Sequence, residues 1–160
     1  MTIKVGDRLP EADLHEASAD GRERVSSKEI FKNRKVVLFA VPGAFTPTCH
    51  EMHLPSFLDN LDAIRKRGAD LIACVAVNDV DVMKAWAKQS GAQGKITFLA
   101  DGNGDFTRKV GLDVDYSKYG MGTRSKRYSM IVEDGVVRSL NIEDGPGVKK
   151  SGAETILQQL

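Results

Sequence analysis

Apolar residues in the first two thirds of this chain gather in three unbroken runs, separated by segments in which they recur at every third or fourth position. The runs cover residues 35–41, 70–77 and 96–100. Short apolar runs that are rich in β-branched residues and bounded by turn-forming residues are typical of buried strands. The pattern therefore predicts three strands in the interior of a sheet.

Helical spacing predicts two longer helices between these strands. The first covers about 48–67, where Pro55 is expected to kink it, and the second covers about 79–90. The apolar face of the first helix is formed by Met52, Phe57, Leu58, Leu61 and Ile64. A further short helix is expected around Phe106 and Val110. The alternation of strands and helices favours an α/β fold with a largely parallel sheet.

The C-terminal third begins with residues 111–123, which show little periodicity and are expected to form an irregular loop. Residues 128–132 and 136–142 then read as two strands. They flank Asp134-Gly135, a pair that favours a tight hairpin, so these strands should be antiparallel. A final helix is expected to start near Gly152.

A length of 160 residues favours one domain, residues 1–160. The parallel strands and the antiparallel hairpin together predict a central mixed β-sheet flanked by helices. Lys and Arg total 23 and Asp and Glu total 22, so the net charge of +1 gives no broad positive field for nucleic acid or an acidic membrane. The first residues lack the apolar stretch of a signal peptide, and no apolar run is long enough to span a bilayer. We therefore expect a soluble, cytoplasmic protein without nucleic acid or membrane partners.

One of the two cysteines, Cys49, lies where a predicted strand gives way to a predicted helix. Thr46 is a favourable N-cap residue and Pro47 suits the first helical position, which puts Cys49 in the first turn. The unpaired N–H groups and the positive dipole end of a first turn favour an anion, so the thiolate form of Cys49 should be stabilised. Because open α/β sheets place their sites at the carboxyl ends of strands, Cys49 is the candidate nucleophile.

The remaining chemistry-bearing residues fit other kinds of site less well. Cys74 falls within an apolar strand and is expected to be a buried, inert thiol. His50 and His53 follow Cys49, but a cysteine protease takes its base from a distant part of the chain, and His15 lies in a polar segment. Two histidines and two separated cysteines also make a poor zinc site. The Cys-x-x-Cys motif of a dithiol oxidoreductase is absent from the sequence.

Two blocks of sequence carry a family resemblance. The first is Pro42-Gly43-Ala44-Phe45-Thr46-Pro47-Thr48-Cys49, in which proline, threonine and cysteine have the spacing P-x-x-x-T-x-x-C. The second covers residues 124–130 and places Arg127 directly before the first hairpin strand. In both blocks the chain resembles the peroxiredoxins, and within them the atypical type II or type 5 subgroup.

This resemblance implies a thioredoxin-like fold and a thiol-dependent peroxidase that needs no cofactor and no metal. Cys49 would be the peroxidatic nucleophile, which attacks a peroxide oxygen and becomes a sulfenic acid. Arg127, Thr46 and first-turn N–H groups would stabilise the leaving oxygen, and Pro42 would shield the sulfur from overoxidation. The implied substrates are hydrogen peroxide and organic hydroperoxides. The implied reductant is glutathione or a glutaredoxin, with thioredoxin as a further candidate, and a homodimer is expected.

The chain departs from this subgroup at the position of a resolving cysteine. Where the subgroup has one, it lies in the loop before the last helix, and the corresponding residues 145–152 contain none. The sequence therefore favours a one-cysteine mechanism in which an external thiol reduces Cys49. A redox sensor, in which Cys49 is oxidised and then recognised by a partner, is the alternative. Turnover separates the two, because an enzyme consumes many equivalents of peroxide and a sensor about one.

Overall fold

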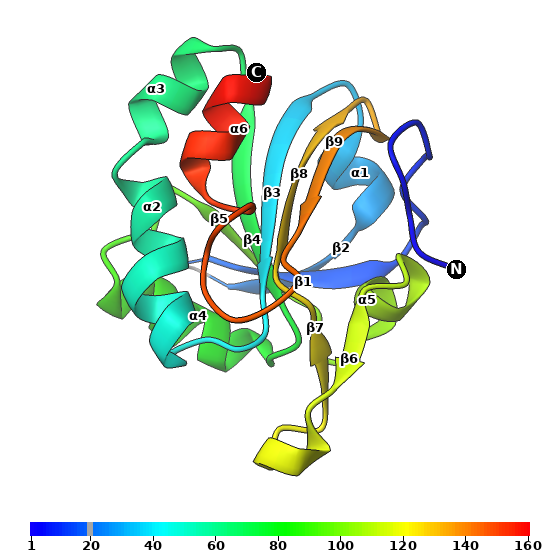
Figure 1. Cartoon of the computed structure of the whole chain (residues 1–160), viewed down its shortest axis with the longest axis vertical. Coiled ribbons are helices and arrows are strands. Elements are labelled where there is room, and N and C mark those ends of the chain that lie inside the picture. The colour runs from blue at the N-terminus through cyan, green and yellow to red at the C-terminus, as the bar shows by residue number, and fades with distance from the viewer. Residues whose placement is uncertain (19–20) are drawn as a thin grey trace.

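Within residues 1–18 and 21–160, which the computed structural model describes, a seven-stranded sheet in the order β2-β1-β5-β4-β3-β8-β9 forms the centre of the fold (Figure 1). Its strands are β1 (Asp13–Ala17), β2 (Arg22–Ser26), β3 (Lys35–Val41), β4 (Leu71–Ala76), β5 (Thr97–Ala100), β8 (Tyr128–Glu133) and β9 (Val136–Ile142). β3 is parallel to β4 and β4 is parallel to β5, whereas β1 joins β5, and β8 joins β3, in antiparallel fashion. The predicted mixed sheet is confirmed, but parallel pairing in the described residues is limited to the three central strands, because each neighbour beyond them pairs in antiparallel fashion.

Helices cover both faces of this sheet. They are α1 (Ser27–Phe31), α2 (Leu54–Leu58), α3 (Leu61–Lys66), α4 (Val80–Gln89), α5 (Asp105–Lys109) and α6 (Ala153–Gln159). Figure 1 shows α2, α3, α4 and α6 on one side of the sheet and α1 and α5 on the other. Alternate residues of β3 supply the two cores, since Val37 and Phe39 pack toward the first set of helices and Val36 and Leu38 toward the second.

The N-terminal hairpin of β1 and β2 was not predicted from the sequence. Its residues are mostly charged or polar, and Leu14 is the buried residue of β1. The hairpin joins the sheet through the backbone of β1, whose Glu16 pairs with Leu99 of β5. A strand held mainly by backbone hydrogen bonds leaves little hydrophobic periodicity, which explains why the pattern missed it.

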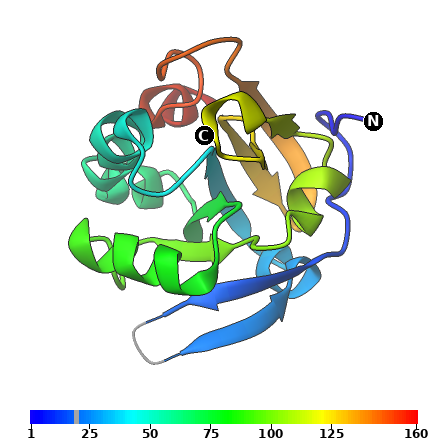
Figure 2. The same ribbon diagram turned by 90° about the horizontal axis from the view of Figure 1, so that it is seen from below.

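The predicted irregular loop over 111–123 is a correction. It contains β6 (Asp113–Asp115) and a 3₁₀ turn (Ser117–Tyr119), and β6 pairs with β7 (Thr123–Ser125) to form a two-stranded arm. Seen from below in Figure 2, the arm lies at the same end of the molecule as the segment that follows β3. Three-residue strands that are largely exposed have no apolar alternation from which to predict them.

The helix predicted over 48–67 is broken into three pieces. A π-helical turn (Cys49–His53) leads into α2, and Asp59 and Asn60 separate α2 from α3. Pro55 has no N–H to donate to the preceding turn, and the N–H of Leu54 reaches back five residues to the carbonyl of Cys49. The wider turn changes the helical spacing, so Met52, predicted on the apolar face, is 51% exposed.

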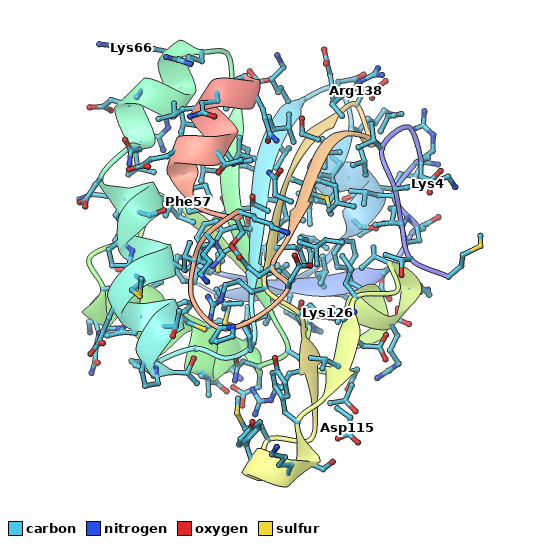
Figure 3. All side chains as sticks on the ribbon, in the orientation of Figure 1. Lys4, Phe57, Lys66, Asp115, Lys126 and Arg138 are labelled. Carbon is cyan, nitrogen blue, oxygen red and sulfur yellow. The ribbon has the colours of Figure 1, made fainter. Side chains whose placement is uncertain are left out.

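The other predicted elements are confirmed, and the hairpin turn between β8 and β9 shows the expected chemistry. Asp134 has φ of 49° and Gly135 has φ of 79°, the pair of left-handed conformations for which Asp-Gly is favoured. In Figure 3, Phe57 lies between α2 and the sheet, whereas Lys66 and Arg138 extend outward at the end away from the arm. Throughout the described part of the chain, every helix is too short or too polar to cross a membrane.

Candidate active site

The loop between β3 and the π-helical turn brings Cys49 to the carboxyl ends of the parallel strands. The N–H of Ala44 donates to Oδ1 of Asn78, which lies just beyond β4, at 2.9 Å. Phe45 has φ of 66°, a strained conformation for a side chain of this size, and such strain is concentrated at functional sites. Cys49 itself is completely buried. The site therefore lies where an open α/β sheet is expected to place one.

Thr46 occupies the predicted position, but its side chain makes a different hydrogen bond. Its carbonyl accepts from the N–H of His50 at 2.8 Å, as an N-cap carbonyl does. Its hydroxyl, however, donates to the carbonyl of Gly43 at 2.6 Å, because the tight turn brings that carbonyl within reach. Among residues 1–18 and 21–160 no first-turn N–H donates to this hydroxyl, so the predicted side-chain cap is wrong. The oxygen keeps its lone pairs for another donor.

Arg127 is brought directly to the sulfur of Cys49. Its Nη2 donates to Sγ of Cys49 at 3.1 Å. Arg127 precedes β8, and two-residue alternation puts it on the same face of the sheet as Ile131, which packs in the core that contains Cys49. A guanidinium carries a permanent positive charge and favours an anionic partner. The arrangement therefore places a fixed cationic donor directly against the sulfur of Cys49.

The second terminal nitrogen of this guanidinium contacts His53, and the sequence analysis did not predict this contact. Nη1 of Arg127 lies 3.0 Å from Nδ1 of His53, and Nε2 of His53 lies 2.9 Å from the carbonyl of Ser151. A carbonyl can only accept, so Nε2 carries the proton and Nδ1 accepts from Arg127. The position of His53 one helical turn beyond Cys49 was the available signal, since residues four apart share a helix face.

The surroundings of His53 keep its imidazole neutral. The ring packs against Phe39 and Phe57, with centroids 5.1 Å and 5.7 Å away. Burial, assisted by the charge of Arg127, lowers the pKa of His53 to about 3, although the Ser151 carbonyl acts in the opposite direction. A neutral ring accepts from Arg127, whereas an imidazolium would repel it. The low pKa of His53 therefore preserves the contact between Arg127 and Cys49.

Neither histidine near Cys49 is arranged as the base of a cysteine protease. Nδ1 of His50 accepts from Nε1 of Trp86 at 3.0 Å, and the ring of Phe45 stacks on His50 at 6.1 Å. Nδ1 of His53 is occupied by Arg127. In the described ranges, 1–18 and 21–160, no hydrogen bond joins either imidazole to Sγ of Cys49. A protease would require one.

Pro42 and Cys74 lie nearby in different settings. Pro42 is half-buried directly after β3, at the start of the loop that leads to Cys49. Cys74 lies in the middle of β4, completely buried in the same core as Cys49, as predicted. Burial raises the pKa of the Cys74 thiol, and the neighbouring Cys49 raises it further, against an opposing effect of Arg127. Cys74 is therefore kept as a neutral thiol.

Arg124, which belongs to the same basic cluster as Arg127, is half-buried rather than fully exposed to solvent. Its Nη1 donates to the carbonyl of Val77 at 3.0 Å and its Nε to the carbonyl of Met121 at 2.8 Å. Val77 follows β4 and Met121 belongs to the arm, so Arg124 ties the arm to the strand end beside the site. Of the basic residues 124–127, Lys126 is the exposed one, at the base of the arm in Figure 3.

The fold and this site define an α/β protein of the thioredoxin-like class, with one buried cysteine next to an arginine at the carboxyl ends of the parallel strands. The chain matches the family model described as Redoxin over residues 4–157. It is 42% identical to the chloroplastic peroxiredoxin-2E of Arabidopsis thaliana, covering 99% of this chain and 70% of that protein. The chain belongs to the Redoxin family and, within it, to the peroxiredoxins of the type II or type 5 group.

Solved structures agree with this placement. Reduced Prx3 from Vibrio vulnificus in complex with H2O2 has a TM-score of 0.94 and 46% identity, with 98% of both chains covered. Peroxiredoxin 5 from Alvinella pompejana has a TM-score of 0.85 and 36% identity, with 98% of this chain and 97% of that chain covered. The protein is a thiol-dependent peroxidase, an oxidoreductase with a thioredoxin-like fold that acts in antioxidant defence on a peroxide and a thiol reductant.

Proposed function

We propose that Cys49 is the peroxidatic cysteine and that Arg127, Thr46 and Pro42 form its site. The observation that carries this proposal is the 3.1 Å contact between Nη2 of Arg127 and Sγ of Cys49. A buried sulfur with a fixed cationic donor is a strong candidate for a stable, reactive thiolate. The H2O2 complex of the Vibrio vulnificus relative supports hydrogen peroxide as a substrate, and organic hydroperoxides share the reacting O–O bond.

The reaction follows from these groups. The thiolate of Cys49 attacks one peroxide oxygen, an S–O bond forms and the O–O bond breaks. The sulfur supplies two electrons and becomes a sulfenic acid, and the departing oxygen takes up a proton to leave as water or an alcohol. Arg127 donates to the oxygen on which negative charge develops. Because the Thr46 hydroxyl donates to Gly43, it presents its lone pairs to the O–H of the peroxide.

An external thiol completes the cycle in this proposal. The loop before α6 has no cysteine at residues 145–152, and burial keeps Cys74 neutral. A first glutathione would condense with the sulfenic acid, releasing water and forming a mixed disulfide at Cys49. A second glutathione, or a glutaredoxin, would then attack the glutathione sulfur of this mixed disulfide, form a new disulfide with it and release the free Cys49 thiol. Pro42, at the start of the loop, would limit the access of water and further peroxide to the sulfenic acid.

A homodimer of the cytoplasm is the setting we propose for this activity. Phe45 and Met52 are 41% and 51% exposed on either side of Cys49 in the chain, and Tyr119 on the arm is 65% exposed. Exposed apolar side chains of this size favour an interface between copies. A reducing compartment also keeps an unpaired reactive thiol available. Sedimentation of the reduced protein tests the dimer.

The decisive experiment follows peroxide consumption under anaerobic conditions with three reductants: glutathione alone, glutathione with glutaredoxin, and thioredoxin with its reductase. The proposal expects many turnovers with glutathione or glutaredoxin, and none in Cys49→Ser. Consumption of about one equivalent with every reductant would instead support the redox-sensor alternative. Turnover with thioredoxin alone would keep the peroxidase and overturn the proposed reductant.

A further inference from the structure

The orientation of His53, the histidine that contacts Arg127, depends on the loop between β9 and α6. Nε2–H of His53 donates to the carbonyl of Ser151, and Ser151 is buried just before α6. Figure 1 shows this loop, drawn in orange and red, crossing the sheet on the side of α2. The position of one backbone carbonyl in the loop therefore sets the orientation of His53.

Glu143, at the other end of this loop, holds the carbonyl in place. Its Oε2 accepts from the N–H groups of Lys149, Lys150 and Ser151 at 2.9, 2.7 and 2.7 Å, and from Oγ of Ser151 at 2.7 Å. Partial burial raises the pKa of Glu143, but the hydrogen bonds from Ser151, Lys150 and Lys149 outweigh it and hold the pKa below its usual value. Glu143 is thus a carboxylate that gathers three successive amides.

The same residue is also tied to the arginine through the main chain. The N–H of Glu143 donates to the carbonyl of Arg127 at 3.0 Å. The contacts form a closed circuit: from the backbone of Arg127 to Glu143, from its carboxylate to Ser151, from Ser151 to His53, and from His53 to the Arg127 guanidinium. Both ends of Arg127 are therefore fixed by one residue: its carbonyl by the main-chain N–H of Glu143, and its guanidinium, through Ser151 and His53, by the Glu143 carboxylate.

We propose that Glu143 is a positioning residue for peroxide reduction, which acts through Ser151 and His53 to hold Arg127 against Cys49. Without the carboxylate, three amides lose their acceptor and the loop relaxes. The buried Nε2–H of His53 then loses its acceptor, the Ser151 carbonyl. The Nε2–H tautomer of the ring is no longer favoured over the Nδ1–H tautomer. A proton on Nδ1 would face the N–H of Arg127 and break that contact.

The test compares Glu143→Ala with Asp144→Ala in the full chain. Asp144→Ala removes the neighbouring carboxylate, which within residues 1–18 and 21–160 pairs only with the exposed Lys150 ammonium. Since this inference rests on the proposed role of Cys49, the readout is the second-order rate of Cys49 oxidation by hydrogen peroxide. We expect a loss of ~10-fold or more for Glu143→Ala, as for misplaced catalytic groups elsewhere, and less than about 2-fold for Asp144→Ala. Equal rates in the two variants would overturn the inference.

Two further measurements separate positioning from a general structural role. Nitrogen-15 shifts of His53 should show the Nε2–H tautomer in the wild type and in Asp144→Ala, and a loss of that single tautomer in Glu143→Ala. In a His53→Gln background, Glu143→Ala should change the rate by less than about 2-fold, because the intermediary is already gone. If Glu143→Ala lowered the rate by the same factor in the His53→Gln background as in the wild type, action through His53 would be contradicted.

Two controls keep the outcomes distinct. If Glu143→Ala does not fold, Glu143→Gln carries the same comparison against Asp144→Asn, with a smaller expected loss in the same direction. If Cys49→Ser retained peroxidase activity, the proposed function itself would fail. An inactive Cys49→Ser with a fully active, folded Glu143→Ala would instead overturn only the role of Glu143.

Discussion

Cys49 and Cys74 share one core and are both 0% exposed, yet the fold gives their sulfur atoms different surroundings. Cys49 ends a strained loop and meets the guanidinium of Arg127 at 3.1 Å. Cys74 lies within β4, where burial raises the pKa of its thiol. What distinguishes Cys49 is therefore the charged donor that contacts its sulfur, rather than its access to solvent.

The two cysteines should differ most in the loss of activity on substitution. Cys49→Ser is expected to abolish peroxide reduction, because a serine hydroxyl cannot form the sulfenic acid. Cys74→Ala, which avoids burying an unpaired hydroxyl, should retain most of the activity. Steady-state peroxide consumption measures both. If both variants folded and lost a comparable share of the activity, the two cysteines would not differ in the way proposed.

Removing the charged donor should make Cys49 less reactive toward hydrogen peroxide, and so more like Cys74. Arg127→Ala is expected to slow the reaction with hydrogen peroxide by on the order of 100-fold, since a preorganised donor to the developing charge is lost. Lys126→Ala is the matched control, as Lys126 is the exposed neighbour. An unchanged rate in Arg127→Ala would reduce the arginine to a structural role.

A smaller effect is expected on the free energy of unfolding. It comes from the neutral His53, which belongs to the surroundings of Cys49 and has no counterpart beside Cys74. The pKa of His53 is lowered from 6.5 to about 3, so between these values the unfolded chain binds one more proton than the folded chain. The free energy of unfolding should therefore fall by ~1.4 kcal/mol for each pH unit below 6.5. Between about pH 6.5 and about pH 5 the loss is about 2 kcal/mol.

Denaturant unfolding of the wild type and of His53→Gln at these two pH values checks this. Glutamine does not titrate, so its unfolding free energy should fall by about 2 kcal/mol less over the interval. Effects of other acidic and basic groups are common to both proteins and cancel. Parallel pH dependence in the two proteins would show that His53 is not held neutral.

Much of this comparison could be predicted from the sequence because it rests on local pattern. An apolar run marks β4 and the burial of Cys74, and the Pro42–Cys49 string marks the loop and the start of a helix. The position of Arg127 directly before β8, together with the family resemblance, selected it from the basic cluster, and the structure brings it to Cys49.

The contacts that sequence reasoning missed join distant residues through the backbone. The Ser151 carbonyl that orients His53 and the main-chain amides that hold Glu143 have no side-chain signature. The hydroxyl of Thr46 was assigned to the helix start, but a tight turn brought the Gly43 carbonyl closer. Which acceptor a hydroxyl uses depends on distances that only the folded loop determines.

The most direct test treats the reduced protein with one equivalent of hydrogen peroxide and no reductant, and then maps both cysteines by mass spectrometry. We predict a chain that is one oxygen heavier and not disulfide-linked to a second copy; in separate samples its Cys49 is trapped by dimedone or converted by glutathione to a mixed disulfide. Cys74 should remain a free thiol throughout. A stoichiometric disulfide between Cys49 and Cys74, or dimedone on Cys74, would contradict the account.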